Sequence, residues 1–139
     1  MAEFVMKDLV KREGLSDQFL IASAATSTEE IGNGVHYGTK RKLNSLGIST
    51  AGKTAVQLRK ADYDQYDFLI GMEERNVINM KRIVGHDKAH KVHRLLDFTR
   101  RKGDIADPWY TGDFDTTYED VYEGCNGLLE WLRAEGKIK

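Results

Sequence analysis

The stretch Asp67-Phe68-Leu69-Ile70-Gly71-Met72 (DFLIGM) carries the clearest structural signal in the sequence. A short apolar run of this kind is typical of a strand that is buried on both faces of a sheet. Residues 73–84 follow it directly and place Val77, Met80 and Val84 on one side of a predicted helix, which ends at Gly85. A buried strand that leads straight into an amphipathic helix is typical of a parallel sheet.

Similar signals occur on both sides of this stretch. Residues 19–25 (FLIASAA) and 92–97 (VHRLLD) are short apolar runs that predict two further strands. On the helix predicted over residues 36–46, Tyr37, Leu43 and Leu46 should face inward. The remaining predicted elements are a helix that starts at Ala2 and is closed by Gly14, a helical turn over residues 58–63, and a long helix over residues 117–133, for which residues 113–117 offer the cap.

Strands that alternate with helices indicate an α/β fold with three layers, in which helices cover both faces of a parallel sheet. Ligands in such folds bind outside the carboxyl ends of the strands. Three loops leave those ends, over residues 23–34, 73–76 and 98–110. The third of these loops contains Asp107-Pro108-Trp109-Tyr110.

The only proline in the chain, Pro108, holds Asp107 in an extended conformation on this third loop. A carboxylate followed by two large aromatic residues could donate a proton beside an aromatic-walled pocket. The same four residues would also suit an exposed turn anchored by two rings. The tetrapeptide alone leaves both interpretations open.

Length and composition exclude several classes of protein. The 139 residues fit one domain, and the net charge of −1 gives no electrostatic footprint for nucleic acid. No apolar run approaches the roughly 20 residues that cross a bilayer, and the first residues do not resemble a signal peptide. A single cysteine excludes an intrachain disulfide and a thiolate zinc cluster. We therefore expect a cytoplasmic protein.

Two other groups of residues leave alternatives open. Four histidines invite a metal site, but His86 and His90 lie in a predicted loop, so solvated side chains are the preferred interpretation and no metal is expected. Short basic runs at residues 40–42 and 100–102 are interpreted as solvated faces, with attraction of phosphorylated, acidic targets as the alternative. The four histidines are His36, His86, His90 and His93.

The loops together resemble one family, the low-molecular-weight protein tyrosine phosphatases. The resemblance spans essentially the whole chain in the right order, and it implies a parallel four-stranded sheet with helices on both sides. It also implies a phosphotyrosine-containing protein or a small aryl phosphate as the partner, and no cofactor. The segments that carry it are residues 23–27, 31–33, 46–48, 62–67 and 71–73, together with Asp107-Pro108-Trp109-Tyr110.

The resemblance also implies roles for individual residues. Asp107 matches the general acid, which protonates the leaving tyrosine oxygen and later activates water. Trp109 and Tyr110 match the aromatic walls that receive the substrate ring, and Ser23 matches a hydroxyl that supports the nucleophile region. Two further positions depart from the family: Glu73 replaces a strand-end aspartate, and Lys53 falls where the family has a histidine.

The central motif of that family, Cys-x5-Arg-Ser/Thr, does not occur in these residues. Cys125 lies in an apolar stripe, and the residue six positions later is Trp131. Residues 1–5 resemble the helix that follows the motif, and that predicted helix has no N-cap of its own. We therefore interpret residues 1–139 as a single, N-terminally truncated domain that lacks the nucleophile and the phosphate loop and is inactive as given.

The truncation has a structural consequence, because the missing strand is central in the family. Two strand edges would be left unpaired, so we expect either closure of those strands against each other or a homo-oligomer that fills the gap. A non-catalytic, phosphatase-like binding or oligomerising protein is the alternative function. A related arsenate reductase is a weaker alternative, because its chemistry needs several thiols.

Overall fold

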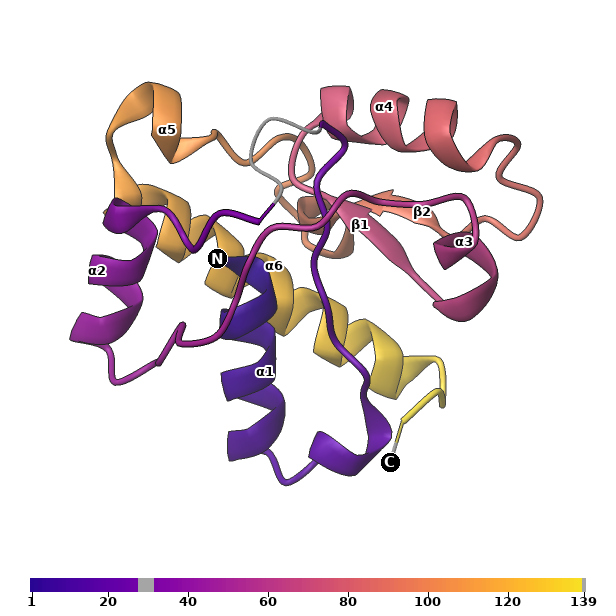
Figure 1. The fold of residues 1–139 in the computed structure, drawn as a ribbon. Coiled ribbons are helices and arrows are strands. Elements are labelled where there is room, and N and C mark those ends of the chain that lie inside the picture. Colours follow the sequence, from indigo (N-terminus) through magenta and orange to yellow (C-terminus); the bar gives the residue numbers. More distant parts are fainter. Residues whose placement is uncertain (28–31, 139) are drawn as a thin grey trace.

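A parallel pair of strands lies at the centre of the computed structural model, which describes residues 1–27 and 32–138 and, for Trp109, only the backbone. Strand β1 (Leu69–Gly71) pairs with β2 (Val92–Arg94), with Leu69 opposite Val92 and Gly71 opposite Arg94. Helix α4 (Glu74–Val84) connects them and packs on one face (Figure 1). The predicted α/β class with a parallel sheet is confirmed.

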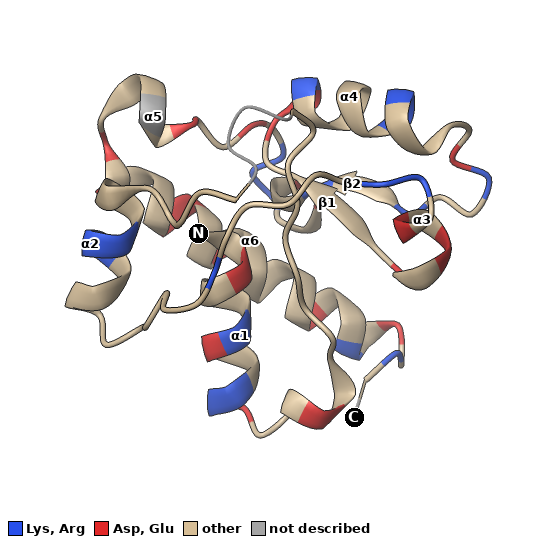
Figure 2. Cartoon of the chain, viewed as in Figure 1, with Lys and Arg blue, Asp and Glu red and all other residues tan. Residues whose placement is uncertain are grey.

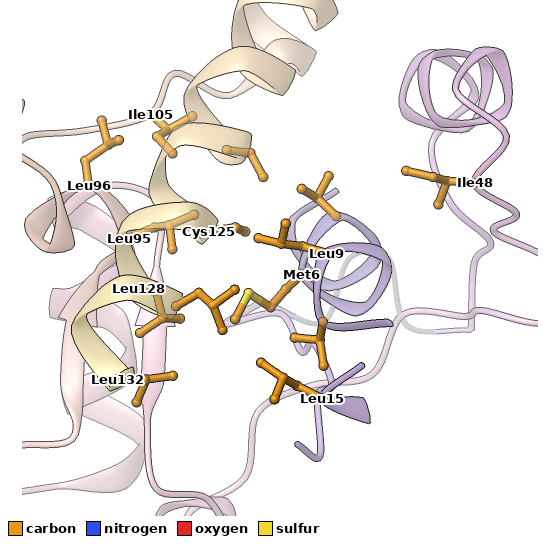
Figure 3. Packing of buried hydrophobic residues seen from close by; sticks show 14 of the residues in the cluster. Met6, Leu9, Leu15, Ile48, Leu95, Leu96, Ile105, Cys125, Leu128 and Leu132 are labelled. Carbon is orange, nitrogen blue, oxygen red and sulfur yellow. The ribbon is translucent and has the colours of Figure 1, made fainter. Parts of the chain in front are cut away.

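The other face is covered by α1 (Ala2–Arg12) and α6 (Phe114–Ala134), with α2 (Tyr37–Ser45) packed beside α6. Helix α6 begins where Asp113 accepts a hydrogen bond from the Thr116 N–H, as a cap should. Figure 3 shows Met6 and Leu9 of α1 facing Cys125 and Leu128 of α6, where they form the main hydrophobic cluster.

A second, smaller cluster lies between α4 and the strands. Val77, Met80 and Val84 of α4 are buried against Leu69 and Val92. The buried side of α4 therefore agrees with the periodicity in the sequence. Among the described residues, the buried hydrophobic side chains thus form two clusters, one on each face of the sheet.

The prediction of a strand over residues 19–25 is wrong. The segment is mainly extended, but its only bridge among the described residues pairs Ala25 with Gln57. A strand requires a hydrogen-bonded neighbour along its length. Here residues 53–58 approach only one end of the segment, and no described strand pairs with its other edge. The expected closure of this segment against β1 does not occur either.

Several other expectations need smaller corrections. The predicted strand over residues 92–97 ends at Arg94, because Leu95 and Leu96 turn into the core in the short helix η2 (Leu95–Phe98). Tyr37 and Leu46 are exposed, and only Leu43 of the three faces the core, because α2 packs through a narrow stripe. The remaining short helices are η1 (Ser16–Gln18), α3 (Asp62–Gln65), which starts four residues later than the predicted turn, and α5 (Pro108–Thr111).

Within the described part of the chain, no helix has the length and apolar character needed to cross a membrane.

Candidate active site

A long cavity of about 1330 Å³ runs between residues 19–25 and β1, and we call it the slot. Its lining includes Ser23 near the end of residues 19–25, Glu73 just after β1, and Asp107 on the loop that follows β2 and η2. The structure therefore brings three of the five predicted site residues to one end of the slot. This end corresponds to the carboxyl ends of the strands, where the topology predicts ligand binding.

Asp107 is held by the residues on both sides of it. The Ile105 N–H donates to the Met72 carbonyl at 2.8 Å, and the Ile105 side chain is buried. The Thr117 hydroxyl of α6 donates to the Ala106 carbonyl at 3.1 Å. After Asp107, Pro108 opens α5, as expected for a residue with a fixed φ and no N–H. The exposed carboxylate therefore projects from a loop that is fixed to β1, α6 and α5.

An ion cluster fixes the start of the same loop. Arg94 at the end of β2 contacts Asp104 at 3.1 Å, Asp97 at 3.3 Å and Glu74 at 3.8 Å. The Glu74 N–H also donates to Asp104 at 2.8 Å. The neighbouring carboxylates raise the pKa of Arg94, led by the hydrogen bond to Asp104. One guanidinium thus joins the end of β2, the start of α4 and the loop that carries Asp107.

The structure describes the two predicted aromatic walls only in part. The Tyr110 side chain is 75% exposed and does not line the slot. The side chain of Trp109 lies outside the described residues. Tyr110 therefore stands on the outer surface of α5, next to Asp107 in the sequence but outside the cavity.

The predicted hydroxyl, Ser23, belongs to an ionic cluster around the buried carboxylate of Glu3. Its Oγ donates to Glu3 Oε1 at 2.6 Å, and Lys53 Nζ contacts the same oxygen at 2.7 Å. Lys53 also donates to the Ser23 carbonyl at 3.3 Å, and Lys7 contacts Glu3 Oε2 at 2.7 Å. Burial alone would raise the pKa of Glu3, but the hydrogen bonds from Lys53, Lys7 and Ser23 outweigh it and lower the pKa to about 2.

Glu3 was not identified as a site residue from the sequence. One signal was available, because Glu3 and Lys7 are four residues apart on a predicted helix and such pairs interact. The contact with Lys53 joins residues 50 positions apart and could not be read from spacing. Lys53 thus makes an ion pair with the buried Glu3, which lines the slot.

Glu73 has a structural role at the start of α4. Its side chain accepts a hydrogen bond from the backbone of Asn76, and Asn76 Oδ1 accepts one from the Glu73 N–H at 2.9 Å. Asn76 Oδ1 also accepts from the Met72 N–H at 3.0 Å. This reciprocal cap directs the chain from β1 into α4 and places Glu73 at the slot.

Cys125 does not have the surroundings of a nucleophile. Its side chain lies in the main cluster at 1% exposure, and burial raises the pKa of the thiol to about 12. A thiol attacks phosphorus as its thiolate, so this sulfur is poorly suited to the reaction. The interpretation of Cys125 as a structural residue agrees with this environment.

The remaining charged groups are interspersed over the surface (Figure 2). Lys42 pairs with Asp115 at 2.8 Å, and Arg101 pairs with Asp120 and Glu123. These contacts favour solvated, internally paired faces for the two basic runs. Within residues 1–27 and 32–138, no three His, Cys, Asp or Glu side chains gather as metal ligands.

Comparisons with known proteins place this geometry in a family. Residues 1–138 match the family described as low molecular weight phosphotyrosine protein phosphatase. The chain is 32% identical to the low molecular weight protein-tyrosine-phosphatase YfkJ of Bacillus subtilis, over 99% of this chain and 90% of the relative. It is 29% identical to PtpA of Staphylococcus epidermidis, over 100% of this chain and 88% of the relative.

Solved structures agree with these matches. The crystal structure of YfkJ superposes with a TM-score of 0.92 at 32% identity and covers 96% of this chain and 86% of that one. A phosphatase from Streptococcus pyogenes superposes with a TM-score of 0.81 at 38% identity and covers 96% and 81%. The matched family description and these relatives lead to one conclusion: the chain belongs to the low-molecular-weight phosphotyrosine protein phosphatase family.

Proposed function

We propose that residues 1–139 form a domain of a metal-free protein tyrosine phosphatase that acts on phosphotyrosine proteins or small aryl phosphates. The observation that carries the proposal is the placement of Asp107, held on a loop fixed to β1 and α6 at the carboxyl end of the sheet. In this role Asp107 protonates the leaving phenolate oxygen and then takes a proton from the attacking water. Relatives named as tyrosine phosphatases support the substrate class.

The other site residues have supporting roles in the proposal. Trp109 and Tyr110 keep the role that the family resemblance assigns to them, which is contact with the aryl ring of the substrate. The hydroxyl of Ser23 and the carboxylate of Glu73 hold the slot end in shape, the first through Glu3 and the second through the α4 cap. No cofactor takes part.

The polypeptide as given is proposed to be inactive, because none of its described residues can serve as the family nucleophile. Cys125 is buried with a raised pKa, and no Cys-x5-Arg motif is present. The test is hydrolysis of p-nitrophenyl phosphate by the 139-residue chain, with Asp107→Asn and Cys125→Ser as controls. All three chains should give the same background rate of p-nitrophenyl phosphate hydrolysis. Turnover by the unaltered chain at an ordinary enzymatic rate, about 1–10³ s⁻¹, would contradict the proposal.

The role of Asp107 can be tested separately. A fusion that places a strand and a Cys-x5-Arg-Ser loop ahead of Met1 should hydrolyse aryl phosphates. Asp107→Asn in that fusion should lower kcat by about 10²–10⁴-fold, as expected for loss of a general acid. An unchanged kcat with a phenolate leaving group of high pKa would exclude the assigned role.

A second function is favoured by the slot itself. Open strand edges beside a structured site suit a non-catalytic protein that receives another chain. The two functions differ in one measurement, because only the phosphatase role predicts activity in the fusion.

A further inference from the structure

A second cavity, of about 400 Å³, lies at the end of α4, and we call it the α4 cavity. The loop that borders it, residues 85–91, precedes β2, whereas the loop of Asp107 follows β2 and η2. The cavity therefore lies at the opposite end of the strands from the candidate active site (Figure 1). Its volume is within the range of small-molecule sites. The lining residues are Lys81, Gly85, His86, Asp87 and His90.

The segment around the α4 cavity is basic. Residues 81–91 contain four Lys or Arg and one Asp, a local net charge of +3 with the histidines neutral, in a chain whose net charge is −1. Basic residues lie at the end of α4 and along the loop that follows (Figure 2). The C-terminal dipole of α4 works against an anion at this place, and the local positive charge offsets it. A concave surface with an excess of one charge attracts ligands of the opposite charge.

The donor side chains at the α4 cavity are not used within the protein. In the described ranges 1–27 and 32–138, the side chains of Lys81, His86 and His90 form no hydrogen bond and no ion pair. All three are exposed. An ammonium has three N–H donors, and an imidazole has at least one in either tautomer. A ligand in the cavity can therefore meet at least five donors from these three side chains.

The carboxylate at the α4 cavity, that of Asp87, is already satisfied. Its Oδ1 accepts from the Tyr63 hydroxyl at 2.6 Å and the Lys91 N–H at 2.8 Å, and its Oδ2 accepts from the Val92 N–H at 3.2 Å. Burial would raise the pKa of Asp87, but these hydrogen bonds and the charge of Lys81 lower it. The ammonium of Lys81 also opposes a cation. The cavity therefore suits an anion rather than a metal ion.

The main chain at His90 is fixed before any ligand binds. The φ of His90 is 52°, in the left-handed region that few residues other than glycine adopt. On one side the Ala89 N–H donates to the Tyr63 hydroxyl at 2.9 Å, and on the other the Lys91 N–H donates to Asp87 at 2.8 Å. Such a conformation persists only where its surroundings hold it, and it is often found at binding sites.

We propose that the α4 cavity binds a small phosphate-type anion, either a free phosphate or a phosphomonoester. Its described lining contains no arginine, whose fork matches a planar carboxylate. Separate donors from one ammonium and two imidazoles instead suit a tetrahedral oxyanion, which accepts hydrogen bonds in several directions. The site goes beyond the proposed phosphatase role and does not depend on it, because none of the catalytic candidates lines this cavity.

The test follows amide NMR shifts of the 139-residue chain during separate titrations with sodium phosphate, sodium pyrophosphate and glycerol 2-phosphate. Ionic strength is held at about 0.15 M, so that screening is constant. We expect saturable shifts of the amides of residues 85–91, with a dissociation constant of about 1 mM or lower for pyrophosphate. The ester separates free phosphates from phosphomonoesters as the source of the ligand. Unchanged amide shifts in all three titrations would overturn the proposal.

A matched pair of variants separates a site from general electrostatic attraction. Lys81→Gln and Arg82→Gln remove the same charge from neighbouring exposed positions of α4, but only Lys81 lines the cavity. Lys81→Gln should weaken pyrophosphate binding roughly tenfold, as expected for the loss of one charged hydrogen bond. Arg82→Gln should weaken it less than about twofold, because a more distant charge is screened. Equal losses in the two variants would overturn the proposal.

His90→Gly tests the contribution of the loop. Glycine adopts a φ of 52° without strain, so the loop should keep its shape while one donor is lost. We expect pyrophosphate to bind roughly tenfold more weakly to this variant. Unchanged binding would remove His90 from the site and contradict the proposed donor set.

Citrate and zinc chloride are the competing probes on the unaltered chain. Tighter binding of citrate than of pyrophosphate at residues 85–91 would make the cavity a carboxylate site. Tighter binding of zinc at the same amides would make it a metal site. Either result would overturn the proposal of a phosphate-type ligand.

Discussion

At the scale of single residues, Glu3 is a buried charge of the site that has three side-chain partners. Its carboxylate is 5% exposed and contacts Lys7, Lys53 and Ser23. A buried charge is tolerated only when it is paired and hydrogen-bonded, and here both oxygens have partners. The cluster joins the first turn of α1 to Ser23 and Lys53, which lie far apart in the sequence. Stability should therefore depend on the charge of this one group.

The pH dependence of Glu3→Gln tests this dependence. The pKa of Glu3 is about 2 in the fold and near 4.5 when unfolded, so its contribution is complete above pH 4.5 and is lost as the pH falls through 2. We expect a difference in unfolding free energy of roughly 3 kcal/mol between the unaltered chain and Glu3→Gln at pH 7. Urea titrations from pH 7 to 2 measure it, and a difference that is constant with pH would contradict the assignment.

Cys125 gives a second prediction for a single residue. Because burial raises its pKa to about 12, the folded chain should resist alkylation by iodoacetamide at pH 8. The chain unfolded in guanidinium should react at the rate of a free thiol, and this serves as the control. Rapid modification of the folded chain would show that the thiol is accessible, and would reopen the question of its role.

Among the elements, α6 packs closely against η2. A Cβ on Gly127 would lie 2.6 Å from the Phe98 carbonyl oxygen, and one on Gly124 would lie 2.5 Å from the Leu95 side chain. The main chain at Phe98 cannot move aside to make room, whereas the side chain of Leu95 can. The approach of α6 to η2 also fixes the start of the loop that leads to Asp107, so these glycines support the site from a distance.

Gly127→Ala should therefore destabilise the chain, although alanine is the better helix former by about 1 kcal/mol. We expect a loss of about 1–3 kcal/mol, as is typical of overpacking, because the contact is with main chain. Gly124→Ala is the matched comparison and should cost less, because Leu95 can change its rotamer. Thermal unfolding of both variants measures these losses of stability. A stabilised Gly127→Ala would show that α6 and η2 are not in close contact.

How well each element was predicted depended on where its partners lie. The unit of β1 and α4 was predicted correctly, because the apolar run of the strand and the buried stripe of the helix are local in sequence. The strand over residues 19–25 was not, because an apolar run shows burial but does not show whether a neighbour exists to pair with it. The same limit applies to the site: the prediction for the Asp107 loop came from a motif, whereas the Glu3–Lys53 pair depends on tertiary contact.

At the scale of the whole molecule, the two hydrophobic clusters are joined only partly. The main cluster holds α1, α6 and η2 together, and the smaller cluster holds α4 against β1 and β2. The slot lies between them along much of β1. Cooperative unfolding requires that regions support one another through contacts. We therefore expect the α4 region to open independently of the α1–α6 region.

Native-state hydrogen exchange tests this expectation. Amides of Val77 and Met80 in α4 should exchange through an opening of lower free energy than those of Val121 and Leu129 in α6. Identical opening free energies in the free chain would mean that the clusters unfold as one unit.

The hydrogen bond from Ile105 to Met72 ties the loop of Asp107 to the end of β1, and this has a thermodynamic consequence. A ligand that engages Asp107 and restricts its loop would therefore also restrict the end of β1. Linkage is reciprocal, so a change that holds the end of β1 more firmly should favour binding at Asp107 by the same factor.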